Sequence, residues 1–113
     1  MDHRELAAEL FLSDCNCAQA VLEAFSDVTG LEKSFAAKLA SSFGGGMGRM
    51  REVCGAVSGM LMVAGLLYGY DDPGENDVNK KAHYQLVQNL AGQFREEIGS
   101  IICREILSNP PSD

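Results

Sequence analysis

The chain has no tryptophan and few other aromatic residues, with three tyrosines and five phenylalanines among its 113 residues. Leu, Ala, Val, Ile and Met side chains must therefore fill the core, and hydrophobic types make up 46% of the sequence. A chain of this length is typical of one domain, so we expect residues 1–113 to form a single cysteine-bearing domain.

Basic residues are also scarce, because 9 Lys and Arg stand against 16 Asp and Glu, which gives a net charge of −7. A nucleic-acid-binding surface needs clustered Lys and Arg, so we expect no nucleic-acid partner. The stretch after Met1 carries mixed charge, lacks the uncharged segment of an export signal and favours a cytoplasmic location. The longest uncharged run, residues 53–70, is short of the ~20 residues that a membrane span needs.

Almost no segment alternates with period two, whereas several have apolar residues at helical spacing. The pattern predicts a turn at 71–74 and caps at Asn16, Asp77 and Ser100. Apolar stripes at residues 6–11, 18–28 and 35–43 mark three helices, and three more are expected over about 50–68, from 78 to about 98, and over 101–107. We therefore predict an all-α fold, an antiparallel bundle of about five to six helices around one central apolar helix, residues 50–68.

Cysteines follow the start signals of several of these helices. Short loops make successive helices antiparallel neighbours, so the starts of the second, fourth and last helices fall at one end of the bundle. We therefore expect Cys15, Cys17, Cys54 and Cys103 at one end, and His83 near the other.

Clustered thiols in a cytosolic protein are more often catalytic or metal-binding than structural. The positive end of a helix lowers a thiol pKa, and Arg49, Arg51 and Arg104 lie close in sequence to these thiols. One hypothesis is redox chemistry at Cys17, Cys54 and Cys103, with Cys15 as an auxiliary thiol. A second is a metal site formed by all four cysteines, and a third is an interaction module whose cysteines are merely buried.

The segment from Phe43 to Arg49 is a glycine-rich loop that includes Gly45 and Gly46. Such loops can cradle anions with backbone N–H groups, but this one lacks the Lys-Ser/Thr ending of a P-loop. Tight passage of the backbone over the bundle end is the favoured interpretation. The pair Gly55 and Gly59 predicts close approach of a neighbouring helix.

Several blocks of this sequence resemble the redox-active protein family named for its C_GCAxxG_C_C cysteine pattern. They are Asn16–Leu22, Phe43–Gly48, Cys54–Gly59 and Gly99–Leu107, in family order. The resemblance implies a small helical bacterial or archaeal protein whose cysteines act in redox chemistry or bind a prosthetic group such as an iron–sulfur cluster.

By position, Cys17, Cys54 and Cys103 match the first three family cysteines. The fourth family cysteine lies further toward the C-terminus, where this sequence has none, and Cys15 is extra. We expect a thiol–disulfide oxidoreductase or an electron carrier whose partner is a redox protein or a small thiol. An iron–sulfur cluster, zinc or no cofactor, and a monomer or a homodimer, stay open.

Overall fold

The computed structural model describes residues 1–71 and 77–108, and it confirms the predicted all-α class. The elements are α1 (His3–Leu12), α2 (Cys17–Ala24), α3 (Ser26–Thr29), α4 (Lys33–Ala40), the 3₁₀ turn η1 (Ser41–Phe43), α5 (Gly44–Met47), α6 (Gly55–Tyr68), α7 (Asp77–Ile98) and α8 (Cys103–Ser108). The described ranges contain no strand, only an isolated antiparallel bridge between Val53 and Ile102.

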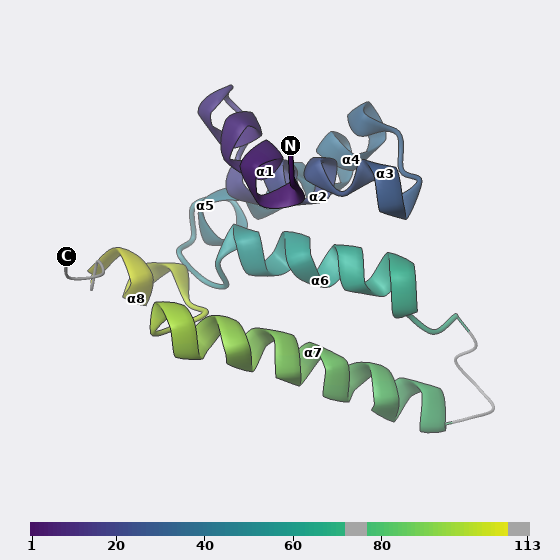
Figure 1. The fold of residues 1–113 in the computed structure, drawn as a ribbon. Coiled ribbons are helices and arrows are strands. Elements are labelled where there is room, and N and C mark those ends of the chain that lie inside the picture. Colours follow the sequence, from purple (N-terminus) through teal and green to yellow (C-terminus); the bar gives the residue numbers. More distant parts are fainter. Residues whose placement is uncertain (72–76, 109–113) are drawn as a thin grey trace.

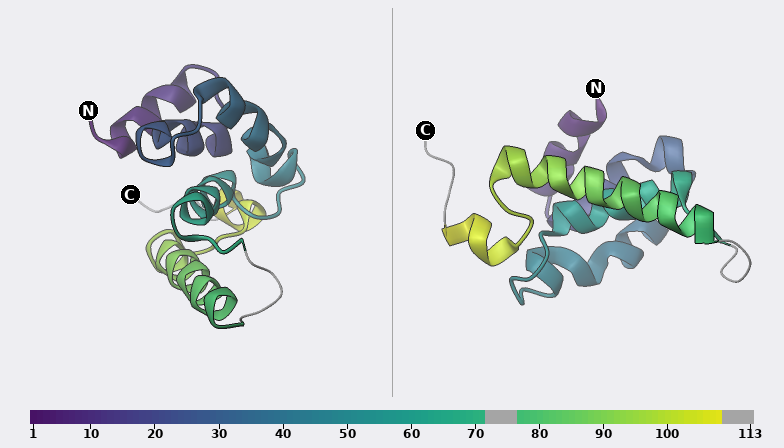
Figure 2. Two further views of the ribbon diagram at one scale, coloured as in Figure 1. Left: turned by 90° about the vertical axis from the view of Figure 1, so that its right-hand side faces the viewer. Right: turned by 90° about the horizontal axis from the view of Figure 1, so that it is seen from below.

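Helix α6 lies between two groups of helices (Figure 1). The N-terminal helices α1–α4 cover one side of it, and α7 runs beside it in the opposite direction on the other side (Figures 1 and 2). The buried core is formed by residues from α2, α4 and α6: Ala18, Leu22, Ala36, Ala40 and Val63. No residue of α7 from Val78 onward is buried, so the core lies on the α1–α4 side of α6.

The start of α2 is fixed by its predicted cap. The Asn16 side chain accepts a hydrogen bond from the Gln19 backbone N–H (2.8 Å), and the Gln19 side chain accepts one from the Asn16 backbone N–H (3.0 Å). This capping box satisfies two backbone donors that would otherwise lack partners, and it makes Cys17 the first residue of the helix.

Two predicted helix starts were wrong, and one long-range contact explains both. The fourth helix begins at Gly55 instead of near Met50, because Val53 pairs with Ile102 in the bridge. The last helix begins at Cys103 for the same reason, and the Ser100 hydroxyl accepts a hydrogen bond from the Ile102 N–H just before it (2.9 Å).

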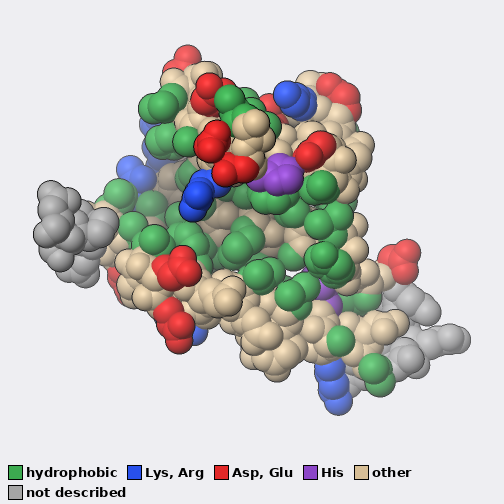
Figure 3. All heavy atoms as spheres, in the orientation of Figure 1, with side chains coloured by type: hydrophobic (Ala, Val, Ile, Leu, Met, Phe, Trp, Pro, Cys, Tyr) green, Lys and Arg blue, Asp and Glu red, His purple; other side chains and the backbone are tan. Residues whose placement is uncertain are grey.

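The expectation that residues 50–68 form a buried helix holds only for the first part of α6. Gly55, Val57, Gly59, Val63 and Ala64 are buried, whereas residues 65–69 are exposed. Hydrophobic side chains accordingly form a visible band between the two helix groups (Figure 3). No helix within the described residues is long and apolar enough to cross a membrane. Residues 72–74 of the predicted turn and the side chain of Asp77, the predicted cap, lie outside the described part of the chain.

Candidate thiol site

Three of the four cysteines lie where helices begin. Cys17 is the first residue of α2, Cys54 is the residue that caps α6, and Cys103 is the first residue of α8. A Cβ atom added to Gly55 would overlap the Cys17 sulfur, so Cys17 lies directly against the start of α6. This contact requires a glycine, and it brings Cys17 next to the residue that follows Cys54.

The bridge brings Cys54 and Cys103 together. The Cys54 N–H donates to the Ile101 carbonyl (2.8 Å), and the Cys103 N–H donates to the Glu52 carbonyl (2.6 Å). Because side chains alternate between the two faces of paired extended segments, Cys54 and Cys103 are diagonal neighbours on the face opposite Val53 and Ile102. Such neighbours have Cα atoms ~7–8 Å apart, slightly beyond the ~4.4–6.8 Å that a disulfide spans.

Burial raises the pKa of the Cys54 thiol, and the negative charges that Cys17 and Cys103 acquire as thiolates raise it further. Hydrogen bonds from the backbone N–H groups of Ala56 and Val57, at the start of α6, act in the opposite direction. Burial therefore prevails over the helix N-terminus, and Cys54 does not have the lowered pKa that its position predicts. The two thiolate effects also place Cys54 within electrostatic range of both other thiols.

Cys15 has a different partner. Its thiol donates a hydrogen bond to the carboxylate of Glu23, a buried residue of α2, over 3.3 Å. Partial burial, this hydrogen bond and the negative charges of Glu23 and Asp14 raise the pKa of Cys15. Its proximity to Glu23 distinguishes it from the other three thiols.

The arginine beside Cys103 is Arg51. Its guanidinium Nη1 lies 3.9 Å from the Cys103 sulfur. Arg104, adjacent in sequence to Cys103, instead pairs with Glu52 (3.2 Å) and approaches the Met50 carbonyl (3.5 Å). Closeness in sequence therefore did not identify the arginine that contacts the sulfur.

The glycine loop reverses the handedness of the backbone next to this site. Five consecutive residues, Gly45 to Arg49, have positive φ, and so does Arg51. A Cβ atom on Gly46 would lie 2.7 Å from the Cys103 Cβ and 2.8 Å from the Arg51 Cα, so this glycine allows the loop to pack against α8.

Backbone donors at the end of this loop are used internally. The N–H groups of Arg49, Arg51 and Glu52 donate to the carbonyls of Gly44, Gly45 and Gly46 respectively. These donors are not directed at an anion. The loop geometry therefore agrees with the interpretation that its glycines allow close backbone passage.

The alternative hypothesis was a metal site formed by all four cysteines. Across residues 1–71 and 77–108, no three or more His, Cys, Asp or Glu side chains are grouped so that they could hold a metal ion. The Cys15 thiol instead donates its hydrogen bond to Glu23. The residues present do not fit zinc or an iron–sulfur cluster in this arrangement.

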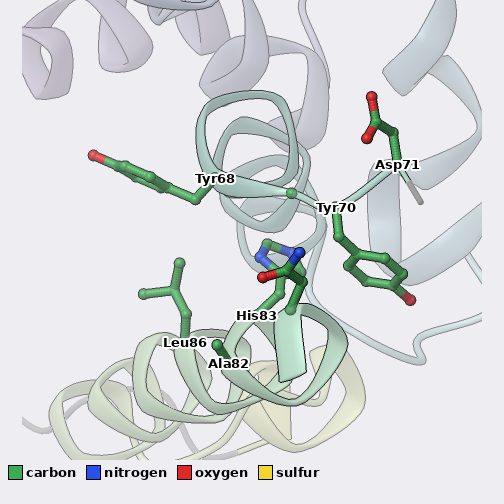
Figure 4. A pocket seen from close by; sticks show the side chains of 8 residues that line it. Tyr68, Tyr70, Asp71, Ala82, His83 and Leu86 are labelled. Carbon is green, nitrogen blue, oxygen red and sulfur yellow. The ribbon is translucent and has the colours of Figure 1, made fainter. Parts of the chain in front are cut away.

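A pocket of about 460 Å³ lies at the other end of α6, where α6 and the first turns of α7 face each other (Figure 4). His83 and Tyr70 line it, and the His83 Nδ1 atom is buried without a hydrogen-bond partner among the described residues. As predicted, His83 is remote from the thiols, because α6 extends ~20 Å between the two ends. The pocket contains no cysteine.

Residues 15–113 match the family described as Putative redox-active protein (C_GCAxxG_C_C). The chain belongs to this family. The match includes all four cysteines, the glycine loop and the bridge, so the site described above lies within the family region. Comparison with curated proteins and with solved structures finds no match.

Proposed function

We propose that this redox-active family member carries out thiol–disulfide exchange, with Cys54 as the central thiol and with Cys103 and Cys17 as its partners. The observation that carries the proposal is the position of Cys54. It lies diagonally opposite Cys103 across the bridge and within electrostatic range of Cys17. All three thiols are free and only partly buried.

Cys103 is the thiol that attacks first. It is only partly buried at the start of α8, and Nη1 of the exposed Arg51 lies 3.9 Å from its sulfur, so a disulfide can approach it from the solvent side. Cys54 has a raised pKa and keeps its proton longer, which suits a thiol that resolves an intermediate.

The exchange proceeds in two displacements. The Cys103 thiolate attacks one sulfur of a substrate disulfide RSSR, so a Cys103–S–S–R bond forms and RS⁻ leaves. The Cys54 thiol loses its proton to solvent and attacks the Cys103 sulfur, which forms a Cys54–Cys103 disulfide and releases the second RS⁻. Formation of this disulfide requires a small backbone shift at the bridge that brings the two Cα atoms within ~6.8 Å. The substrate gains two electrons and the protein loses two. A small thiol or a protein dithiol returns them by the reverse steps.

Peptide mapping of the oxidised protein tests this proposal. The reduced protein is titrated with a disulfide redox buffer, the free thiols are blocked with an alkylating agent, and the disulfide-linked peptides are identified by mass spectrometry. We expect a reversible two-electron transition with Cys54 linked to Cys103, or to Cys17 after exchange. Cys54→Ser should abolish both links and leave Cys103 as a mixed disulfide with the buffer thiol.

Cys15→Ser is the matched control. Cys15 interacts with Glu23, so its substitution should leave the two-electron transition unchanged. The proposal would be wrong if Cys54→Ser retained the two-electron transition, or if the oxidised wild-type protein linked Cys15 to another cysteine as its main product.

A further inference from the structure

The surroundings of Cys103 indicate which disulfides would react there. Arg49 and Arg51 converge on one point of the glycine loop, because a Cβ atom on Gly45 would lie 2.9 Å from the Arg49 Cγ and 3.4 Å from the Arg51 Nη1. Arg51 Nη1 also contacts the Cys103 sulfur. Arg51 therefore contacts the proposed attacking thiol, and Arg49, which is also exposed, lies close to Arg51 on the same loop.

The acidic side chains near this site already have partners. Glu52 pairs with Arg104 over 3.2 Å, and the Glu105 carboxylate accepts a hydrogen bond from the Ser100 hydroxyl. Neither interaction involves Arg49 or Arg51. The site is therefore locally positive on a chain whose net charge is −7.

The backbone gives a separate reason to assign a role to these side chains. Arg49 and Arg51 have φ values of 66° and 64°, in the left-handed region that costs an L-residue ~1–2 kcal/mol and costs glycine almost nothing. The same loop has glycine at positions 44, 45, 46 and 48. Arginine at 49 and 51 is thus the more costly choice for the turn, which is consistent with a need for the guanidinium groups.

We propose that Arg49 and Arg51 select small disulfides and thiols that carry carboxylates, and direct them to Cys103. Guanidinium groups bind carboxylates through two parallel N–H donors, and they attract anions before contact. This inference rests on the proposed thiol–disulfide exchange and specifies its substrate class. The two displacements are those given above, with R carrying the carboxylate.

Three disulfides of similar size but different charge test this preference. 3,3′-Dithiodipropionate is anionic, 2-hydroxyethyl disulfide is neutral and cystamine is cationic. The rate at which each disulfide oxidises the reduced protein is measured at low salt. It is divided by the rate at which the same disulfide reacts with 2-mercaptoethanol, which corrects for differences in reactivity among the three disulfides. We expect the anionic disulfide to react fastest, by about three- to fivefold per arginine over the neutral one. This advantage should nearly disappear at 1 M salt, where the Debye length is ~3 Å.

Arg51→Gln should reduce the anionic advantage by about three- to fivefold, and Arg49→Gln by a similar or smaller factor. Arg95→Gln is the matched control, because Arg95 is an exposed arginine of α7 and its loss changes the net charge equally. It should leave the ratio unchanged.

The other possible results of these rate measurements would each contradict the inference. Equal normalised rates for the three disulfides, or a cationic preference that follows the net charge of −7, would overturn the inference and leave thiol–disulfide exchange standing. If none of the disulfides oxidises the protein, the proposed function and the inference both fail. An equal loss of anionic preference in Arg95→Gln would attribute the effect to overall charge and contradict the assignment to Arg49 and Arg51.

Discussion

Substitution of Gly46 provides the sharpest test of how the glycine loop packs against the thiol site. Gly46 is buried with φ of 74°, and an added Cβ would lie 2.7 Å from the Cys103 Cβ and 2.8 Å from both the Arg51 Cα and the Glu52 nitrogen. Two of these three atoms belong to the backbone and cannot move aside as the end of a flexible side chain can. Gly46→Ala should therefore be destabilising for two separate reasons.

The first reason is the left-handed backbone, which costs an L-residue ~1–2 kcal/mol. The second is the overlap, and overpacking of a filled site typically costs ~1–3 kcal/mol. We expect Gly46→Ala to lower the free energy of unfolding by ~2–5 kcal/mol, a large part of the ~5–15 kcal/mol of a typical native protein.

Gly48→Ala separates the two contributions. Gly48 also has positive φ, 59°, but an added Cβ would have only the Ser42 carbonyl oxygen nearby, at 3.9 Å. This variant should therefore lose ~1–2 kcal/mol. Gly92→Ala, in the middle of α7 with nothing within 4 Å of an added Cβ, should instead gain ~0.5–1 kcal/mol.

Urea denaturation followed by circular dichroism measures all three variants. An excess loss of ~1–3 kcal/mol in Gly46→Ala over Gly48→Ala corresponds to about 1 M in the urea midpoint. Equal losses in Gly46→Ala and Gly48→Ala would refute the close packing of the loop against Cys103 and Arg51. Alkylation of Cys103 in the folded variants adds a second readout, because Gly46→Ala should displace its Cβ and change its rate.

The thiols of Cys15 and Cys54 have pKa values above the ordinary 9.0, so the folded protein keeps these protons at pH values where the unfolded chain releases them. Their contribution to the free energy of unfolding should therefore be constant below pH 9 and fall above it. Cys54→Ser should make this fall smaller, as measured by urea midpoints from pH 8 to 11. A Cys54–Cys103 disulfide would close a loop of about 50 residues, and in the chain-entropy description it should add ~4 kcal/mol to the stability. Amide hydrogen exchange in α7 (Asp77–Ile98) should slow on oxidation, and identical exchange in both redox states would count against the pair. Asn16→Ala removes the cap of α2 and should cost ~1–2 kcal/mol in thermal unfolding, whereas a change within error would show that the capping box contributes little.

Local signals were sufficient for much of the fold. The cap at Asn16 could be predicted from neighbouring residues alone, because a polar side chain directly precedes apolar residues at helical spacing. It correctly predicted Cys17 as the first residue of α2. Gly30 ends α3 in the left-handed conformation, with φ of 79°. The spacing of Gly55 and Gly59 correctly indicated close helix contact, since added Cβ atoms there would meet α2.

The features that were missed depend on residues far apart in the sequence. The start of α6 was misplaced because Val53 pairs with Ile102, and no pattern within residues 50–54 indicates that partner. Arg51, which contacts the Cys103 sulfur, lies two residues before Val53, and Cys103 follows Ile102. Arg51 contacts that sulfur from a backbone with positive φ, and sequence patterns do not predict this conformation for arginine. The buried Glu23 that bonds Cys15 likewise had no local signal.

The left-handed run from Gly45 to Arg49 has a consequence for which substitutions count as conservative. Its backbone has the handedness that D-amino acids prefer, so ordinary similarity scales do not apply within it. Asparagine, which tolerates this conformation, should replace Met47 or Arg49 with less backbone strain than valine or isoleucine. A substitution in this segment should therefore be judged first by whether the new residue can adopt positive φ, and only then by the chemistry of its side chain.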